Sequence, residues 1–155
     1  LRQPTPRRDF LTGVVDLGQP QPGSDDSRGR PGAAAKVDPC RFADFGAVFP
    51  SWLAEGLRRG AFDTMKPIQR KVLPLALGGR DVVGIAPTGS GKTLAFLVPA
   101  MVHVAGQPSP LRASDGPVAL VLAPTRELAV QIGAVADGLM RFSRGAGGRG
   151  YQAAV

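Results

Sequence analysis

The sequence has few cysteine, histidine and aromatic residues, and each scarcity excludes a class of protein. A single cysteine, Cys40, rules out an internal disulfide framework and any zinc site built from several cysteines. The one histidine, His103, falls within a predicted helix, where we expect a structural or solvated role. No apolar run approaches the roughly 20 residues that a membrane-spanning helix requires. We therefore expect neither a metal cluster of the protein's own nor a membrane partner.

Residues 1–41 are predicted to form a disordered, basic tail rich in proline and glycine. They offer few apolar side chains whose burial could offset the entropy of ordering the backbone. The exceptions are Phe10, Leu11, Val14 and Val15, which are either a short docking segment or isolated apolar residues without a role. The length of the remainder, residues 42–155, is that of about one domain.

The chain carries a net charge of +7, and most of this charge lies outside the tail. Seven basic and five acidic residues occur through position 41, against twelve and seven after it. A basic domain suits a polyanionic partner, because neutralising phosphates releases counterions. A compositional bias of the source genome is the alternative explanation. Residues 143–150 form a glycine- and arginine-rich run that is either a flexible RNA contact or a frayed end.

After the tail, patterns typical of helices alternate with short apolar runs typical of buried strands. Helical spacing and end signals predict helices over residues 51–59, 67–77, 92–104 and 127–142. Continuous apolar runs predict buried strands at 82–85 and 118–122, and residues 106–116 read as a surface loop. This order predicts an α/β fold in which a parallel sheet is flanked by helices. Ligands of such folds bind at the carboxyl ends of the strands.

Residues 86–93 read Ala-Pro-Thr-Gly-Ser-Gly-Lys-Thr between a predicted strand and a predicted helix, as expected of a phosphate-binding loop. Glycine lets successive backbone N–H groups turn toward anionic oxygens, and the following helix adds its positive end. Lys92 can reach the terminal phosphates, and the Thr93 hydroxyl can ligate Mg²⁺. The candidate nucleotide-binding residues here are Ala86, Pro87, Thr88, Gly89, Ser90, Gly91, Lys92 and Thr93.

Two motifs in this order resemble those of a known family. Ala86 stands where the general phosphate loop has glycine, and this variant resembles the first, ATP-binding motif of superfamily 2 helicases. Residues 124–129, Pro-Thr-Arg-Glu-Leu-Ala, resemble the next motif of DEAD-box proteins, which grips the sugar-phosphate backbone of RNA. The resemblance implies that Pro124, Thr125 and Arg126 contact RNA. It gives Glu127 a role in orienting its neighbours or capping the helix.

A third element lies upstream of the loop. Residues 62–69, Phe-Asp-Thr-Met-Lys-Pro-Ile-Gln, resemble the Q motif of DEAD-box proteins, although Ala61 and Met65 depart from its usual Gly and Pro. The amide of Gln69 carries a donor and an acceptor and can therefore pair with adenine. The family also packs an upstream aromatic on adenine, for which Phe42 is the first candidate and Phe45 the second.

The resemblance covers residues 39–142, about two thirds of the chain. It implies an intracellular DEAD-box ATP-dependent RNA helicase, with a P-loop NTPase fold and with ATP, Mg²⁺ and RNA, single-stranded or duplex, as ligands. Residues 42–155 would then be the N-terminal part of the first RecA-like domain, and the compartment is left open. Because no Asp-Glu-Ala-Asp run occurs, the catalytic set is incomplete. We expect this chain to bind nucleotide weakly, with Lys92 and Thr93 supporting phosphoryl transfer, but not to hydrolyse it.

Two other classes of function remain open from the sequence. A different phosphate-loop NTPase would not need Gln69, so equal affinity for GTP and ATP would favour it. A non-catalytic remnant that binds nucleotide or RNA is the second alternative. An uncovered apolar sheet face, poor solubility or a random-coil circular dichroism spectrum would favour a chain without stable structure.

Overall fold

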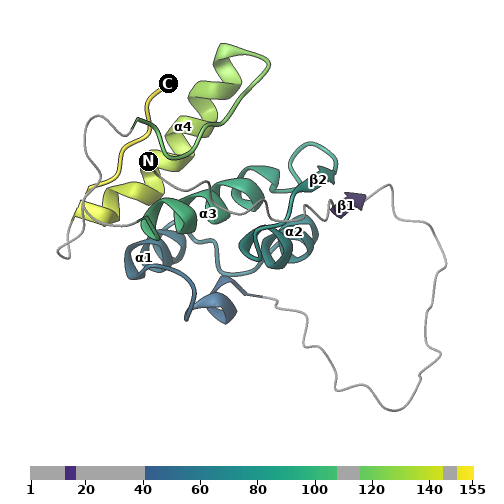
Figure 1. Cartoon of the computed structure of the whole chain (residues 1–155), viewed down its shortest axis with the longest axis horizontal. Helices are drawn as coiled ribbons and strands as arrows, with labels where there is room; N and C mark the ends of the chain where they lie inside the picture. Colours follow the sequence, from purple (N-terminus) through teal and green to yellow (C-terminus); the bar gives the residue numbers. More distant parts are fainter. Residues whose placement is uncertain (1–12, 17–40, 108–115, 145–149) are drawn as a thin grey trace, which may run out of the picture.

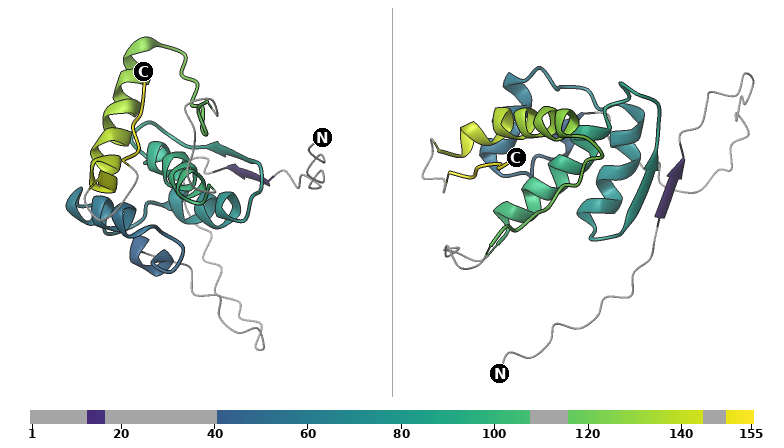
Figure 2. Two further views of the ribbon diagram at one scale, coloured as in Figure 1. Left: turned by 60° about the vertical axis from the view of Figure 1, so that its left-hand side comes forward. Right: turned by 90° about the horizontal axis from the view of Figure 1, so that it is seen from above.

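The computed structural model describes residues 13–16, 41–107, 116–144 and 150–155. The elements, with η marking a short 3-10 helix, are β1 (Gly13–Asp16), η1 (Phe42–Phe45), α1 (Ser51–Arg59), α2 (Pro67–Leu77), β2 (Val82–Ile85), α3 (Lys92–Ala105), α4 (Arg126–Met140) and η3 (Arg141–Arg144). Strands β1 and β2 pair in parallel, and the α-helices gather on one side of them (Figure 1; Figure 2). The predicted α/β class is confirmed.

The predicted helices are confirmed, with small differences at their ends. Helix α2 begins at Pro67, a position where the helix requires no backbone N–H donor, and it ends before Gly78. Helix α1 begins at Ser51, as predicted, and Pro50 occupies its cap position. Helix α4 ends at Met140, and the chain continues as η3 instead of extending the α-helix to residue 142.

Strand β2 carries the chain into the phosphate loop, and only one of its faces is covered. Val82 packs on the cluster of Ile68 and Val72 from α2, while Val83 and Ile85 point the other way and are 49% and 53% exposed. Alternate residues of a strand face opposite sides, so helices on one side bury only half of it. The expectation that residues 82–85 are buried is therefore wrong, although the strand itself is present.

The second predicted strand, residues 118–122, is not formed. This segment is irregular, and Leu120 and Leu122 are 77% and 84% exposed. An apolar sequence becomes a strand only where a neighbouring strand completes its backbone hydrogen bonds. Among the described residues, the strand that pairs with β2 is β1 and not this segment.

Strand β1 lies inside the segment predicted to be disordered, so that prediction is wrong for these four residues. They pair in register with β2, from Gly13 opposite Val82 to Asp16 opposite Ile85. An apolar Val-Val pair can add to a free strand edge because the edge presents unpaired N–H and C=O groups. Apart from Arg41, which forms an isolated bridge with Thr64, the rest of the predicted tail lies outside the described residues, as do most of the 106–116 loop and most of the glycine–arginine run.

The hydrophobic core is formed mainly by α1, α2, α3 and α4. The buried residues that form it are Phe42, Phe49, Leu53, Leu57, Met65, Leu73, Leu94, Leu97, Val98, Met101, Ala136 and Leu139. Helices α2 and α3 pack closely, so the start of α2 and the start of α3 are held near each other. No helix in the described part of the chain combines the length and the hydropathy needed to cross a membrane.

Candidate nucleotide site

The phosphate loop connects β2 to α3 through two glycines with left-handed backbone. Gly89 has φ of 79° and Gly91, the residue before α3, has φ of 91°. Between them, the N–H of Ser90 donates to the carbonyl of Pro87 over 3.3 Å and closes the turn. A side chain at either glycine would strain the backbone, so both positions need glycine for conformational reasons.

The Lys92 side chain folds back onto its own loop. Its Nζ donates to the carbonyl oxygens of Ala86, over 2.6 Å, and Pro87, over 2.8 Å. The first turn of α3 therefore holds an ammonium group over the mouth of the loop. That position combines a mobile positive charge with the positive end of a helix.

Gln69 connects residues 62–69, called the Q-like motif from here on, to the phosphate loop. It is 2% exposed; its Oε1 accepts from the N–H of Lys66 over 2.7 Å and its Nε2 donates to the carbonyl of Gly91 over 3.0 Å. A Cβ at Gly91 would lie 2.5 Å from this Nε2. Since the amide and the loop are in direct contact, the start of α2 and the start of α3 form one structural unit.

Lys66 is a second lysine that contacts the loop, and the sequence patterns did not predict this contact. It precedes α2, its side chain is exposed, and its Nζ donates to the carbonyl of Gly89 over 2.8 Å. The signal available in the sequence was its place three residues before Gln69 at a helix start, which puts both side chains near each other.

The residues of the loop fit a phosphate group. The Oγ of Ser90 is buried and has no hydrogen-bond partner among the described residues. A buried hydroxyl without a partner is rare and is explained where a ligand completes it. With two ammonium groups and a helix start beside it, the surroundings suit an anion.

Mg²⁺ fits the same place only together with a nucleotide. No group of three or more histidine, cysteine, aspartate or glutamate side chains that could hold a metal occurs within the ranges that the structure describes. Mg²⁺ in nucleotide sites takes phosphate oxygens and water with one or two protein ligands. The half-buried Thr93, on the first turn of α3, is the candidate ligand.

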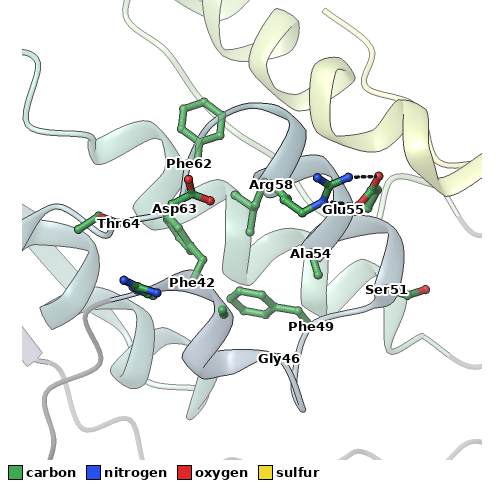
Figure 3. A pocket seen from close by; sticks show the side chains of 13 residues that line it. Phe42, Gly46, Phe49, Ser51, Ala54, Glu55, Arg58, Phe62, Asp63 and Thr64 are labelled. Carbon is green, nitrogen blue, oxygen red and sulfur yellow. Dashed lines mark hydrogen bonds and ion pairs between the residues drawn. The ribbon is translucent and has the colours of Figure 1, made fainter.

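Phe42 lines a cavity to which no residue of the phosphate loop contributes. It is 3% exposed, and its backbone N–H donates to the carbonyl of Asp63 over 3.3 Å. The cavity has a volume of about 770 Å³ and is lined by Phe42, Phe49 and Phe62 among other residues (Figure 3). Phe45 is half-buried and stacks on Phe49 at 5.7 Å. Gln69 does not line this cavity.

The same cavity has a charged edge on α1. Glu55 accepts hydrogen bonds from Arg58 and Arg59, and these bonds lower the pKa of its carboxyl group to about 2. The pKa of Arg58 is raised by the same bond with Glu55. Figure 3 shows the Glu55–Arg58 pair at the end of the cavity opposite Thr64.

The candidate RNA residues lie at the start of α4. Pro124, Thr125 and Arg126 are all exposed. Thr125 caps the helix, because its Oγ1 accepts from the N–H of Leu128 over 3.3 Å. Its hydroxyl hydrogen is left to donate, and donation to a phosphate oxygen is compatible with the cap. The cap is therefore Thr125 and not Glu127.

Comparisons with known proteins agree with these motifs. The family model "DEAD/DEAH box helicase" matches residues 66–150. The chain is 54% identical over 103 residues to the mouse probable ATP-dependent RNA helicase DDX17, a match covering 66% of this chain and 16% of that protein. It is 55% identical over 91 residues to DEAD-box ATP-dependent RNA helicase 20 of Arabidopsis thaliana, covering 59% of this chain and 18% of that protein.

A solved structure gives the same assignment. The chain is similar to the crystal structure of the RNA helicase Prp28 from Chaetomium thermophilum bound to ADP, with a TM-score of 0.54 and 42% identity. That match covers 61% of this chain and 22% of the other. The chain thus spans under a quarter of the length of these relatives. Since the family model matches more than half of its residues, the chain belongs to the DEAD/DEAH box helicase family.

Proposed function

We propose that the chain is the nucleotide-gripping part of an intracellular ATP-dependent RNA helicase and belongs to the first RecA-like domain of that enzyme. Family membership and the similarity to Prp28 support this placement. The observation that carries it is the contact of Gln69 with Gly91, which joins the Q-like motif to a loop already held by Lys92. A glycine-rich turn of unrelated function would not require this hydrogen bond between Gln69 and Gly91.

In this proposal, the loop holds the phosphates of ATP with its backbone N–H groups, and Ser90 donates its buried hydroxyl to them. Lys92 exchanges its two carbonyl acceptors for phosphate oxygens, which are stronger partners because they are charged. Thr93 offers its hydroxyl to the Mg²⁺ that ATP brings. The bound ion neutralises charge on the phosphates.

Adenine recognition is assigned to Gln69. Both ends of its amide are engaged, with Lys66 and Gly91, so reading adenine requires each end to take a second partner or exchange one. Phe42 presents little ring surface to a base because it is almost fully buried. Its contribution is to shape the core beneath the motif, and a stacking role for Phe42 or Phe45 requires η1 to shift.

RNA binding is assigned to the start of α4. Arg126 offers a charged, planar donor set to phosphate, and Thr125 offers one hydroxyl donor. Replacing Arg126 with Gln is expected to weaken single-stranded RNA binding and to lower the salt dependence of affinity by roughly one phosphate contact. Arg80→Gln, at an exposed position before β2, is the matched control and should change neither quantity.

Hydrolysis is not assigned to the residues present. Phosphoryl transfer needs carboxylates that position the metal and the attacking water, and the sequence holds no Asp-Glu-Ala-Asp run. Phosphate release in the presence of RNA should therefore stay at background. RNA-stimulated turnover that Lys92→Ala abolishes would overturn this part of the proposal.

The direct test is binding of a fluorescent ATP analogue in the presence of Mg²⁺, with unlabelled ATP and GTP as competitors. We expect ATP to displace the analogue at lower concentration than GTP, and Lys92→Ala to abolish binding. Equal competition by GTP would instead favour a phosphate-loop NTPase that does not read the base. The absence of any saturable binding would refute the nucleotide site.

A further inference from the structure

Lys66 places a second ammonium group on the phosphate loop, from a different part of the chain than Lys92. Its Nζ lies 2.8 Å from the carbonyl oxygen of Gly89, which is 23 residues away in sequence. A Cβ at Gly91 would lie 2.9 Å from Cδ of Lys66. The lysine stem therefore runs along the loop beside the start of α3, where a helix attracts anions.

The described contacts of both lysines are to neutral carbonyl oxygens. Lys92 bonds Ala86 and Pro87, and Lys66 bonds Gly89. Hydrogen bonds from ammonium to phosphate are shorter and roughly twice as strong as bonds between neutral groups, so a phosphate outcompetes a carbonyl for a mobile ammonium. The salt bridges of Glu55 with Arg58 and Arg59 lie on α1 and include neither lysine.

Lys66 can make that exchange without disturbing the core. Its side chain is exposed and sits on four rotatable carbons, whereas its backbone is fixed by the bond from its N–H to Gln69. The buried side-chain amide of Gln69 thus fixes the backbone of Lys66, while the exposed ammonium group of Lys66 can exchange its hydrogen-bond partner.

We propose that Lys66 is a second phosphate-binding cation of the nucleotide site, which exchanges the Gly89 carbonyl for a phosphate oxygen of a nucleoside di- or triphosphate. This inference rests on the proposed ATP site and adds a residue to it. It makes affinity depend more steeply on the number of phosphates than Lys92 alone would. It also links the Q-like motif to the phosphates as well as to the base.

The test is the affinity of the chain for adenosine, ADP and ATP, each measured by competition with a fluorescent ATP analogue at low and at high salt. Lys66→Gln should weaken ADP and ATP about tenfold, as expected for losing one charged hydrogen bond. Adenosine affinity should stay unchanged. The loss should shrink at high salt, because screening weakens exposed charges.

Two further variants separate a phosphate contact from a structural latch. Lys66→Arg keeps the charge and should retain most of the ATP affinity. Lys71→Gln removes an equal charge from an exposed position of α2, the helix that Lys66 precedes, and should have no effect. Equal losses for adenosine and ATP, or equal losses in Lys66→Gln and Lys66→Arg, would show that Lys66 only holds the loop and would overturn the inference.

The same binding measurements test the role of Lys66 separately from the proposed ATP site. The wild-type chain could bind ATP, with binding abolished in Lys92→Ala and unchanged in Lys66→Gln. That result would support the ATP site and reject the role of Lys66. Wild-type chain that binds none of the nucleotides would reject both.

Discussion

Replacing Gly91 with alanine tests the contact between Gln69 of the Q-like motif and the phosphate loop. Gly91 combines a left-handed φ of 91° with a position where a Cβ would meet Gln69 Nε2 at 2.5 Å. Gly89 shares the left-handed backbone, with φ of 79°, but a Cβ there would meet nothing within 4 Å. The two substitutions therefore differ by the contact with Gln69 and by a second one with the flexible side chain of Lys66, whose Cδ would lie 2.9 Å from the added Cβ.

The expected magnitudes follow from that difference. A non-glycine residue in the left-handed region costs about 1–2 kcal/mol, and both variants carry this cost. Gly91→Ala also displaces the buried Gln69 amide and breaks its bond to the loop, which adds roughly 1–3 kcal/mol because a buried donor is left unsatisfied. We expect the free energy of unfolding to fall by about 1–2 kcal/mol in Gly89→Ala and about 2–5 kcal/mol in Gly91→Ala.

Urea unfolding followed by tryptophan fluorescence measures both changes, since Trp52 is the one tryptophan and packs against the core. Gly138→Ala is the control, because this helix position has no neighbour within 4 Å of an added Cβ and alanine there should stabilise by roughly 0.5–1 kcal/mol. Equal destabilisation by Gly89→Ala and Gly91→Ala would refute the claim that Gln69 and the loop form one unit.

Four further changes test other contacts. Gln69→Leu should lower the free energy of unfolding by about 2–4 kcal/mol in urea, because it leaves two backbone groups without partners. Thr125→Val should cost about 1 kcal/mol through the lost helix cap, and Thr125→Ser should restore it. Gly56→Ala should cost about 1–3 kcal/mol, because its Cβ would lie 3.0 Å from the carbonyl of Leu139. Glu55→Gln should lower stability above pH 5 but not at pH 2, because the lowered pKa of Glu55 gives a contribution that is lost as pH falls from about 4.5 to about 2.

For three of these changes, a specific result would contradict the premise. Thr125→Ser behaving like Thr125→Val would mean that the hydroxyl does not cap α4. A stabilising Gly56→Ala would mean that α1 and α4 are free to separate. A gap between wild type and Glu55→Gln that persists unchanged at pH 2 would mean that the carboxylate is not stabilised by the two arginines.

The loop and the helices could be predicted from the sequence because their signals are local. Two glycines, a lysine and a threonine within a few positions specify a turn before a helix. The apolar spacing around Leu53 or Val72 specifies a helix face regardless of what packs there. Even the helix ends were predicted to within a residue or two, since Pro67 and Gly78 act on their own neighbourhood.

The contacts that depend on distant parts of the chain could not be predicted. Residues 118–122 have a strand-like composition, but strand formation depends on a partner that no local pattern reveals. The burial of Phe42 in the core depends on how η1 packs on α1. Lys66 was overlooked for the same reason, because its contact with Gly89 spans 23 residues.

The contacts of the loop also explain why nucleotide affinity should be modest. Three carbonyl oxygens of the loop, from Ala86, Pro87 and Gly89, already have ammonium partners. Each bond that a lysine makes to a phosphate replaces one that it makes to the loop, so the net gain is only the difference between a charged and a neutral acceptor. Tight binding therefore requires further cations or metal ligands than those present in the described residues.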